Sequence, residues 1–144
     1  MMSSVTGDAK MDGLRFETYI KRRLKDSGLE LLNLGYNEIG DFLLLGEKIR
    51  IIECKVSHKD NYYFSKNQKQ KDRLFKLREL YDISLYYIVQ FPHRKVIKVF
   101  YIDDGFNDIK LNYESGYDLK DAIKFWYEKI YQAPLNPNGE EVEK

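Results

Sequence analysis

Cysteine, histidine and proline are scarce in this chain of 144 residues, which contains one, two and three of them. A single thiol, Cys54, cannot form an internal disulfide, and its place in an apolar segment favours a buried side chain over a nucleophile. We find no Cys/His spacing typical of zinc sites, no glycine-rich phosphate loop and no internal repeat. These absences leave oxygen ligands as the candidates for a metal site.

Long apolar runs are also missing. No segment approaches the roughly 20 residues needed to span a bilayer, and residues 1–10 lack the apolar core of a signal peptide. With 43% hydrophobic and 33% charged residues, the composition is that of a soluble globular protein. We therefore expect a cytoplasmic protein with no membrane partner. It should form one domain over residues 11–131, between a flexible segment 1–10 and a disordered tail 132–144.

The net charge of +1 is small, but it is unevenly distributed. Residues 1–100 hold 19 Lys and Arg against 13 Asp and Glu, whereas residues 101–144 hold 5 against 10. A basic body with an acidic C-terminal part fits a protein that binds DNA on one side. A charge division of this size also arises by chance.

The apolar pattern predicts an α/β fold, in which a central mixed sheet is flanked by helices. Phe16, Ile20 and Leu24 recur every four residues and predict a helix from Asp12 to Ser27. Ser65, with Gln68 as its capping-box partner, should open a helix that runs to about Tyr81. The other predicted elements are strands over 29–34, 39–45, 49–56, 84–91 and 95–102 and a last helix over 118–131.

The strand over 49–56 ends in an unusual way, with Glu53 and Lys55. Because strand side chains alternate, these two share one face, while Ile52 and Cys54 occupy the other. A three-residue hairpin loop, Gly46-Glu47-Lys48, would pair Leu45 with Ile49, Leu43 with Ile51 and Asp41 with Glu53. Two carboxylates would then face each other.

Opposed like charges destabilise a sheet unless a counter-charge lies between them, and a divalent cation supplies that charge. Carboxylates without His or Cys favour a hard ion, Mg²⁺ or Mn²⁺, which also binds substrate phosphate. Lys55 could then orient or deprotonate the attacking water, or stabilise the charge that develops on phosphorus. The pattern indicates metal-assisted phosphodiester hydrolysis. The alternative is an edge strand with a solvated Glu-x-Lys end and an unrelated surface Asp.

Asp41, an apolar hairpin and then Glu53-Cys54-Lys55 resemble the PD-(D/E)xK nuclease superfamily, and most of all the archaeal Holliday-junction resolvases. The segment from Gly13 to Glu17 resembles the first-helix motif of that family. The aromatic segment 62–65, the following helix and the strand 84–91 occur in the family's order. The likeness covers residues 11–102, so residues 103–131 form an extra C-terminal segment.

The resemblance implies a restriction-endonuclease-like core and a Mg²⁺-dependent endodeoxyribonuclease, in which Mn²⁺ would substitute. It adds Glu17 to Asp41 and Glu53 as a catalytic residue and metal ligand, together with the backbone carbonyl of Cys54. It also implies a homodimer that acts on branched DNA in recombination and repair. The candidates for DNA contact are Arg15, His58, Lys59, Tyr63, Lys66, Gln68 and Lys69.

The sequence departs from the family in two places. Gly40 stands where the superfamily has Pro, and the segment Leu34 to Glu38 has no Ser, although the resolvases carry a Ser- and Gly-rich loop there. Nuclease chemistry is therefore better supported than junction specificity. Two further possibilities stay open: a nuclease for flaps, single strands, ends or a recognition sequence in duplex DNA, and a DNA-binding module without catalysis.

Overall fold

The computed structural model describes residues 2–35 and 39–131, with side chains from Asp12 onward except that of residue 104. Its helices are α1 (Met2–Asp26), α2 (Gln68–Tyr81) and α3 (Leu119–Tyr131). Its strands are β1 (Leu31–Asn33), β2 (Phe42–Leu44), β3 (Arg50–Val56), β4 (Asn61–Phe64), β5 (Ser84–Phe91), β6 (Val96–Ile102), β7 (Ile109–Asn112) and β8 (Tyr117–Asp118). Among the described residues, no helix is long and apolar enough to cross a membrane.

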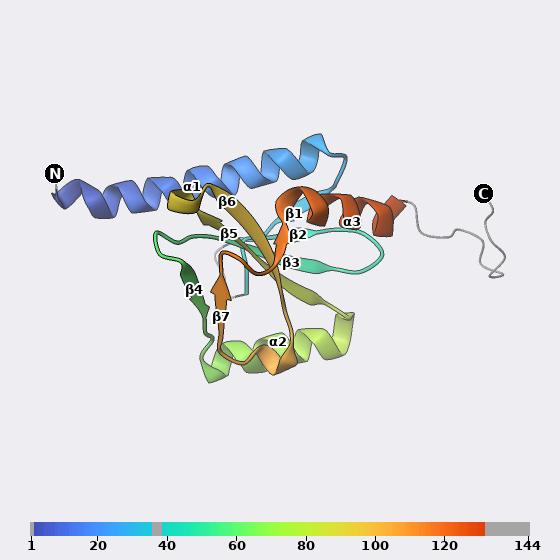
Figure 1. The fold of residues 1–144 in the computed structure, drawn as a ribbon. Coiled ribbons are helices and arrows are strands. Elements are labelled where there is room, and N and C mark those ends of the chain that lie inside the picture. The colour runs from blue at the N-terminus through green and yellow to red at the C-terminus, as the bar shows by residue number, and fades with distance from the viewer. Residues whose placement is uncertain (1, 36–38, 132–144) are drawn as a thin grey trace, which may run out of the picture.

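The strands form a central sheet in the order β1-β2-β3-β5-β6-β8 and a separate two-stranded sheet of β4 and β7. The central sheet is mixed, because β3 and β5 are parallel and its other neighbours are antiparallel. Helices α1 and α3 cover one face, whereas α2 and the β4–β7 pair cover the other (Figure 1). The predicted α/β class with flanking helices is confirmed.

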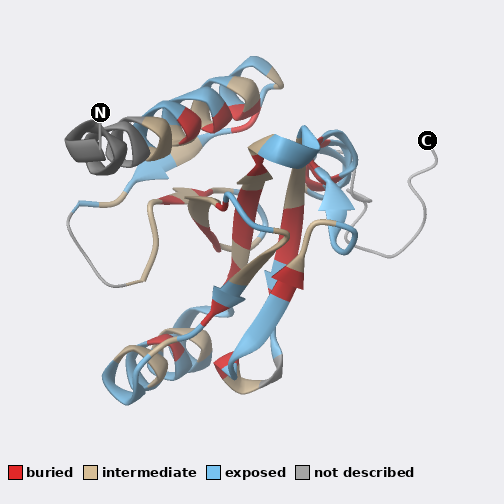
Figure 2. Ribbon diagram, turned by 60° about the vertical axis from the view of Figure 1, so that its left-hand side comes forward, coloured by how far each residue is buried: buried red, intermediate tan, exposed pale blue. Residues whose placement is uncertain are grey.

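Alternating side chains of the strands supply two hydrophobic cores, one on each face. On the α1 side, Phe16, Ile20 and Leu24 pack with Ile52 and Trp126. On the α2 side, Leu74 packs with residues such as Ile51, Leu85 and Phe64. Figure 2 shows the buried residues in the sheet and on the sides of the helices that face it. The charged end of β3 therefore lies between two packed layers.

Several boundaries differ from those predicted. Helix α1 begins at Met2 rather than Asp12, and the expected flexibility of residues 1–10 stays a prediction. Strands β1 and β2 have three residues each, and residues 36–38 lie outside the described part. The tail 132–144 lies outside it too. The extra segment 103–131 contributes β7, β8 and α3, so it is integrated into both sheets and the α1-side core.

The hairpin and the cap of α2 also need correction. The ladder stops at Leu44 opposite Arg50, so Leu45 and Ile49 do not pair; the Leu45 N–H donates instead to the Glu30 carbonyl. The N-cap of α2 is Asn67 rather than Ser65. Asn67 Oδ1 accepts from the Gln70 N–H at 2.8 Å, and Gln70 Oε1 accepts from the Asn67 N–H at 3.0 Å. This reciprocal pair satisfies two helix N–H groups, which fixes the start two residues later.

Candidate active site

Strand β3 carries Glu53 and Lys55 on the face that looks toward α2. Ile51 belongs to the α2-side core, and residues 51, 53 and 55 share a face by alternation. Ile52 and Cys54 pack on the α1 side, as predicted. Burial raises the pKa of the Cys54 thiol well above its usual range, and the charges of Asp41, Glu17 and Glu53 add to that rise. The Cys54 thiol is therefore a packing group, and the charged side chains of this segment remain the candidates for chemistry.

Asp41 comes directly before β2, at the position where a strand one residue longer would begin. The pairs Phe42 with Ile52 and Leu43 with Ile51 match the predicted register, and the Asp41 N–H donates to the Ile52 carbonyl at 2.9 Å. The side chain does not simply face Glu53, however. Its Oδ2 accepts from the Cys54 N–H at 2.7 Å, so the carboxylate occupies the ladder position that a longer β2 would fill. This bond fixes Asp41 on the backbone of the Glu-Cys-Lys segment.

The surroundings of Asp41 disfavour its negative charge. Burial raises its pKa from 3.8 to about 6, against the lowering effect of the Cys54 N–H. The charges of Glu17 and Glu53 raise it further, and the weaker influence of Lys55 lowers it. Carboxylates from α1, from the end of β2 and from β3 therefore interact here. A site that raises a carboxyl pKa by burial and like charge is one that a bound cation would relieve.

Glu53 is contacted by three donors from three parts of the chain. Lys55 Nζ lies 2.9 Å from Oε2, Lys66 Nζ lies 3.4 Å from Oε1, and the Tyr87 hydroxyl also hydrogen-bonds to the carboxylate. Burial alone would lower the pKa of Lys55, but the charge and hydrogen bond of Glu53 raise it above its usual value. Lys55 is therefore a cation at neutral pH, which fits charge stabilisation better than proton abstraction.

Glu17 lies on α1, one residue after the buried Phe16. Its Oε2 is 2.7 Å from Lys21 Nζ, one turn further along the helix, and Lys21 lies over the Phe42 ring. The pair is half-buried against β2, with 26% of the Glu17 side chain exposed. Glu17 is therefore not fully solvated, and it is close enough to raise the pKa of Asp41.

The described side chains do not form a ready-made metal centre. Among them, no three from His, Cys, Asp and Glu lie close enough together to hold one ion. Glu17 and Glu53 are paired with lysines instead. The donor set nevertheless fits a hard divalent cation, because it consists of carboxylates and because burial, together with the charges of Glu17 and Glu53, raises the pKa of Asp41.

The candidate DNA contacts differ in exposure and in their partners. Arg15 and His58 line the same cleft beside α1, together with Tyr19 and Gln90. Lys59, Lys69 and Tyr63 are exposed, Tyr63 with 67% of its surface. Gln68 Nε2 donates to Asp72 in the first turn of α2. Lys66 points inward, and only 7% of its side chain is exposed.

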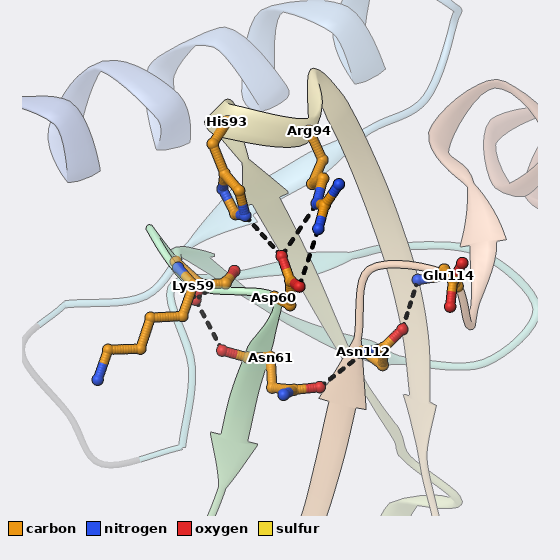
Figure 3. A network of polar contacts seen from close by, with 8 residues as sticks. Lys59, Asp60, Asn61, His93, Arg94, Asn112 and Glu114 are labelled. Carbon is orange, nitrogen blue, oxygen red and sulfur yellow. Dashed lines mark hydrogen bonds and ion pairs between the residues drawn. The ribbon is translucent and has the colours of Figure 1, made fainter.

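The loop after β3 is held by a second polar network (Figure 3). Asp60 Oδ1 lies 2.7 Å from His93 Nε2, and Arg94 donates to both carboxylate oxygens at 3.0 Å. On the neighbouring strand pair, Asn112 Nδ2 donates to Asn61 Oδ1 at 2.7 Å. The network joins the β3–β4 loop to the turn after β5 and so fixes β4 beside the candidate site.

Sequence reasoning missed Tyr87 and the inward direction of Lys66. Tyr87 pairs with Glu53 in the parallel register of β3 and β5, which depends on how α2 carries the chain across the sheet. Burial and then the charge of Glu53 raise the pKa of its hydroxyl, so Tyr87 stays a neutral donor. A tyrosine in a buried strand gives no separate signal for this role. Lys21 was detectable, because Glu17 and Lys21 have the spacing of a helical ion pair.

We compared the chain with known proteins. No family model and no curated protein matches the sequence. Among solved structures, the fold matches that of Hjc from Archaeoglobus fulgidus, a Holliday junction resolvase from an archaeal hyperthermophile. The TM-score is 0.60 at 18% sequence identity, and the match covers 78% of this chain and 96% of that one. The chain therefore has the restriction-endonuclease-like fold of that resolvase.

Proposed function

We propose that this protein is a metal-dependent endonuclease that hydrolyses phosphodiester bonds in DNA, and that its substrates are branched. One observation carries the proposal. Asp41 is fixed by the Cys54 N–H beside Glu53, and its pKa is raised to about 6 in a site that also contains Glu17. The fold shared with a Holliday junction resolvase supports the same proposal.

The metal would be Mg²⁺, with Mn²⁺ as a substitute, held by Asp41, Glu53, the Cys54 carbonyl and Glu17. A bound ion would stabilise charge on the phosphate and lower the pKa of a coordinated water. Lys55, as a cation, would stabilise the negative charge that develops on the phosphate oxygens. Tyr87 keeps Glu53 oriented from the neighbouring strand. Lys55→Ala should therefore abolish turnover and leave metal binding largely intact.

Two copies of the chain would act together. A four-way junction needs two symmetric cuts, and a homodimer places two equal sites on one substrate. The exposed candidates for DNA contact are Arg15, His58, Lys59, Tyr63, Gln68 and Lys69. The acidic C-terminal part would lie away from the DNA.

Two observations favour other readings strongly enough to be tested. The segment before Asp41 lacks the Ser of the resolvase loop, which favours a nuclease with a different DNA substrate. The pairing of Glu17 with Lys21 and of Glu53 with two lysines favours a DNA-binding module without catalysis.

The deciding experiment is a panel of labelled four-way junctions, flaps, duplexes, ends and single strands, each incubated with Mg²⁺, Mn²⁺ or EDTA. We expect metal-dependent cleavage, strongest on the junction and as paired symmetric cuts. Preference for another substrate would replace the branched specificity. Binding without cleavage of any DNA in either metal would contradict the nuclease proposal.

A further inference from the structure

Two lysines contact Glu53, and they differ in burial. Lys55 binds Oε2 with 36% of its side chain exposed, whereas Lys66 faces Oε1 with 7% exposed. Lys66 comes from the segment between β4 and α2, so its place depends on tertiary packing rather than on β3. Both oxygens of one carboxylate thus have an ammonium group beside them, from separate parts of the chain.

Stability alone does not explain the place of Lys66. Burying an ammonium group costs free energy that an ion pair recovers only with good geometry, and an apolar side chain of similar volume often fills such a place at lower cost. The separation from Glu53 is 3.4 Å, longer than a strong charge-assisted hydrogen bond. Around this carboxylate the side chains of Lys66 and Tyr87 also contact each other, with the ammonium 5.8 Å from the ring centroid.

We propose that Lys66 is a positioning residue: it holds Glu53 through Oε1, so that Oε2 is the oxygen that exchanges Lys55 for a divalent cation. The inference rests on the proposed function, since the exchange needs the metal. The difference in exposure supports the division of roles. Lys55 is exposed enough to move toward a substrate, whereas Lys66 is enclosed by the packing around Tyr87.

The two possible roles of Lys66 make opposite kinetic predictions. A residue that orients a metal ligand affects turnover, because Glu53 loses its fixed orientation, and leaves the KM for DNA nearly unchanged. A lysine that contacts a DNA phosphate affects the KM and the salt dependence instead. Lys66→Met removes the ammonium group and keeps most of the buried volume, whereas Lys66→Arg keeps the charge.

The first measurement is cleavage at saturating Mg²⁺ of the DNA that the wild-type protein cuts best. We expect Lys66→Met to lower kcat about tenfold or more with little change in KM, and Lys66→Arg to recover most of the loss. Lys76→Met is the matched control, because Lys76 is an exposed lysine of α2 outside the site, and it should behave like wild type. Wild-type kcat in Lys66→Met, or an effect on KM alone, would overturn the proposal.

The second measurement needs no DNA and no activity. Calorimetry should show that Lys66→Met binds Mn²⁺ about tenfold more weakly than wild type or Lys76→Met, because Glu53 must be reordered. If Lys66 only repelled the cation, its removal would give tighter binding, and that result would overturn the proposal. If Lys66→Met does not fold, Lys66→Gln replaces it, with the same expectations. A wild-type protein that binds Mn²⁺ but cuts no DNA would refute the proposed function, and the calorimetry would still decide the role of Lys66.

Discussion

Asp41 is hydrogen-bonded to β3 and Asp60 lies in the loop after that strand, and their environments shift their pKa values in opposite directions. Asp60 accepts two hydrogen bonds from Arg94 and one contact from His93 Nε2, and these hydrogen bonds lower its pKa to about 2. Asp41 receives one backbone N–H, and burial together with Glu17 and Glu53 raises its pKa to about 6. The contacts of Asp60 with Arg94 and His93, which we call the clasp, neutralise its charge and serve a structural role. The carboxylate of Asp41 has less positive charge around it and is therefore suited to bind a cation.

The largest expected difference between the two aspartates is in catalysis. Asp41→Asn and Glu53→Gln each remove one of the proposed anionic metal ligands at nearly constant volume, so we expect cleavage to fall on the order of 10³-fold or more. Asp60→Asn weakens only the clasp and should cleave at nearly the wild-type rate. Single-turnover assays of the three variants with Mg²⁺ measure this. Full activity in Asp41→Asn would refute the site assignment.

Glu17 should have a smaller effect, because it comes from a different element and already has Lys21 as a partner. Glu17→Gln removes the charge and keeps the size, so the metal-free melting temperature should stay close to that of wild type. We expect cleavage to fall about tenfold, which is about 1.4 kcal/mol of transition-state stabilisation, and the Mg²⁺ dependence to shift to higher concentration. Wild-type rates at limiting Mg²⁺ would exclude α1 from the active site.

The predictability of these residues differs for physical reasons. The proximity of Asp41, Glu53 and Lys55 could be predicted, because strand alternation and the hairpin register bring them together over a short stretch of chain. The clasp could not be found, because Asp60 and Arg94 are brought together by the turn after β5. The same holds for Tyr87, whose position opposite Glu53 is set by the crossover through α2.

Local signals were sometimes degenerate. Ser65 with Gln68 and Asn67 with Gln70 have the same capping-box spacing, and the sequence alone does not choose between them. The five-residue connection between β2 and β3 was also misjudged, because Arg50 turns back to bind Glu47 with two hydrogen bonds, at 2.8 and 3.2 Å. The α/β architecture survived both errors, since it depends on the apolar periodicity of whole elements.

The two aspartates should also change stability over different pH ranges. The pKa of Asp41 is raised, so its contribution to stability is full below 3.8 and is lost as the pH rises through about 6. The shift sets an upper bound of about 3 kcal/mol, and solvent screening should reduce the effect to about 1 kcal/mol. We expect metal-free Asp41→Asn to be more stable than wild type at pH 7 in urea unfolding. If the difference in free energy of unfolding between Asp41→Asn and wild type were the same at pH 4 and at pH 7, this prediction would be contradicted.

Asp60 should behave in the reverse sense. Its pKa is lowered, so the stability that it contributes is present above its ordinary value of 3.8 and is lost as the pH falls through about 2. Asp60→Asn serves as the control for the previous experiment, because it should leave the change between pH 4 and pH 6 unaltered.

The smallest expected effect concerns DNA affinity. Ca²⁺ should support binding without efficient cutting, because its larger and looser coordination positions water and phosphate poorly. Under these conditions, replacing exposed Lys59 and Lys69 with Ala should reduce the slope of log K against log salt by about two. The same change at buried Lys66 should leave the slope unchanged. An unaltered slope in the double variant would place the DNA surface elsewhere.

The most direct test is a titration of the Asp41 carboxyl group by carbon NMR, in metal-free protein and with saturating Mg²⁺. We predict a pKa of about 6 without metal, set by burial and by Glu17 and Glu53. Mg²⁺ should lower that pKa below the ordinary 3.8 and leave Asp60 unchanged. An ordinary pKa for Asp41 that does not respond to Mg²⁺ would contradict the claim that the charged end of β3 is a cation site.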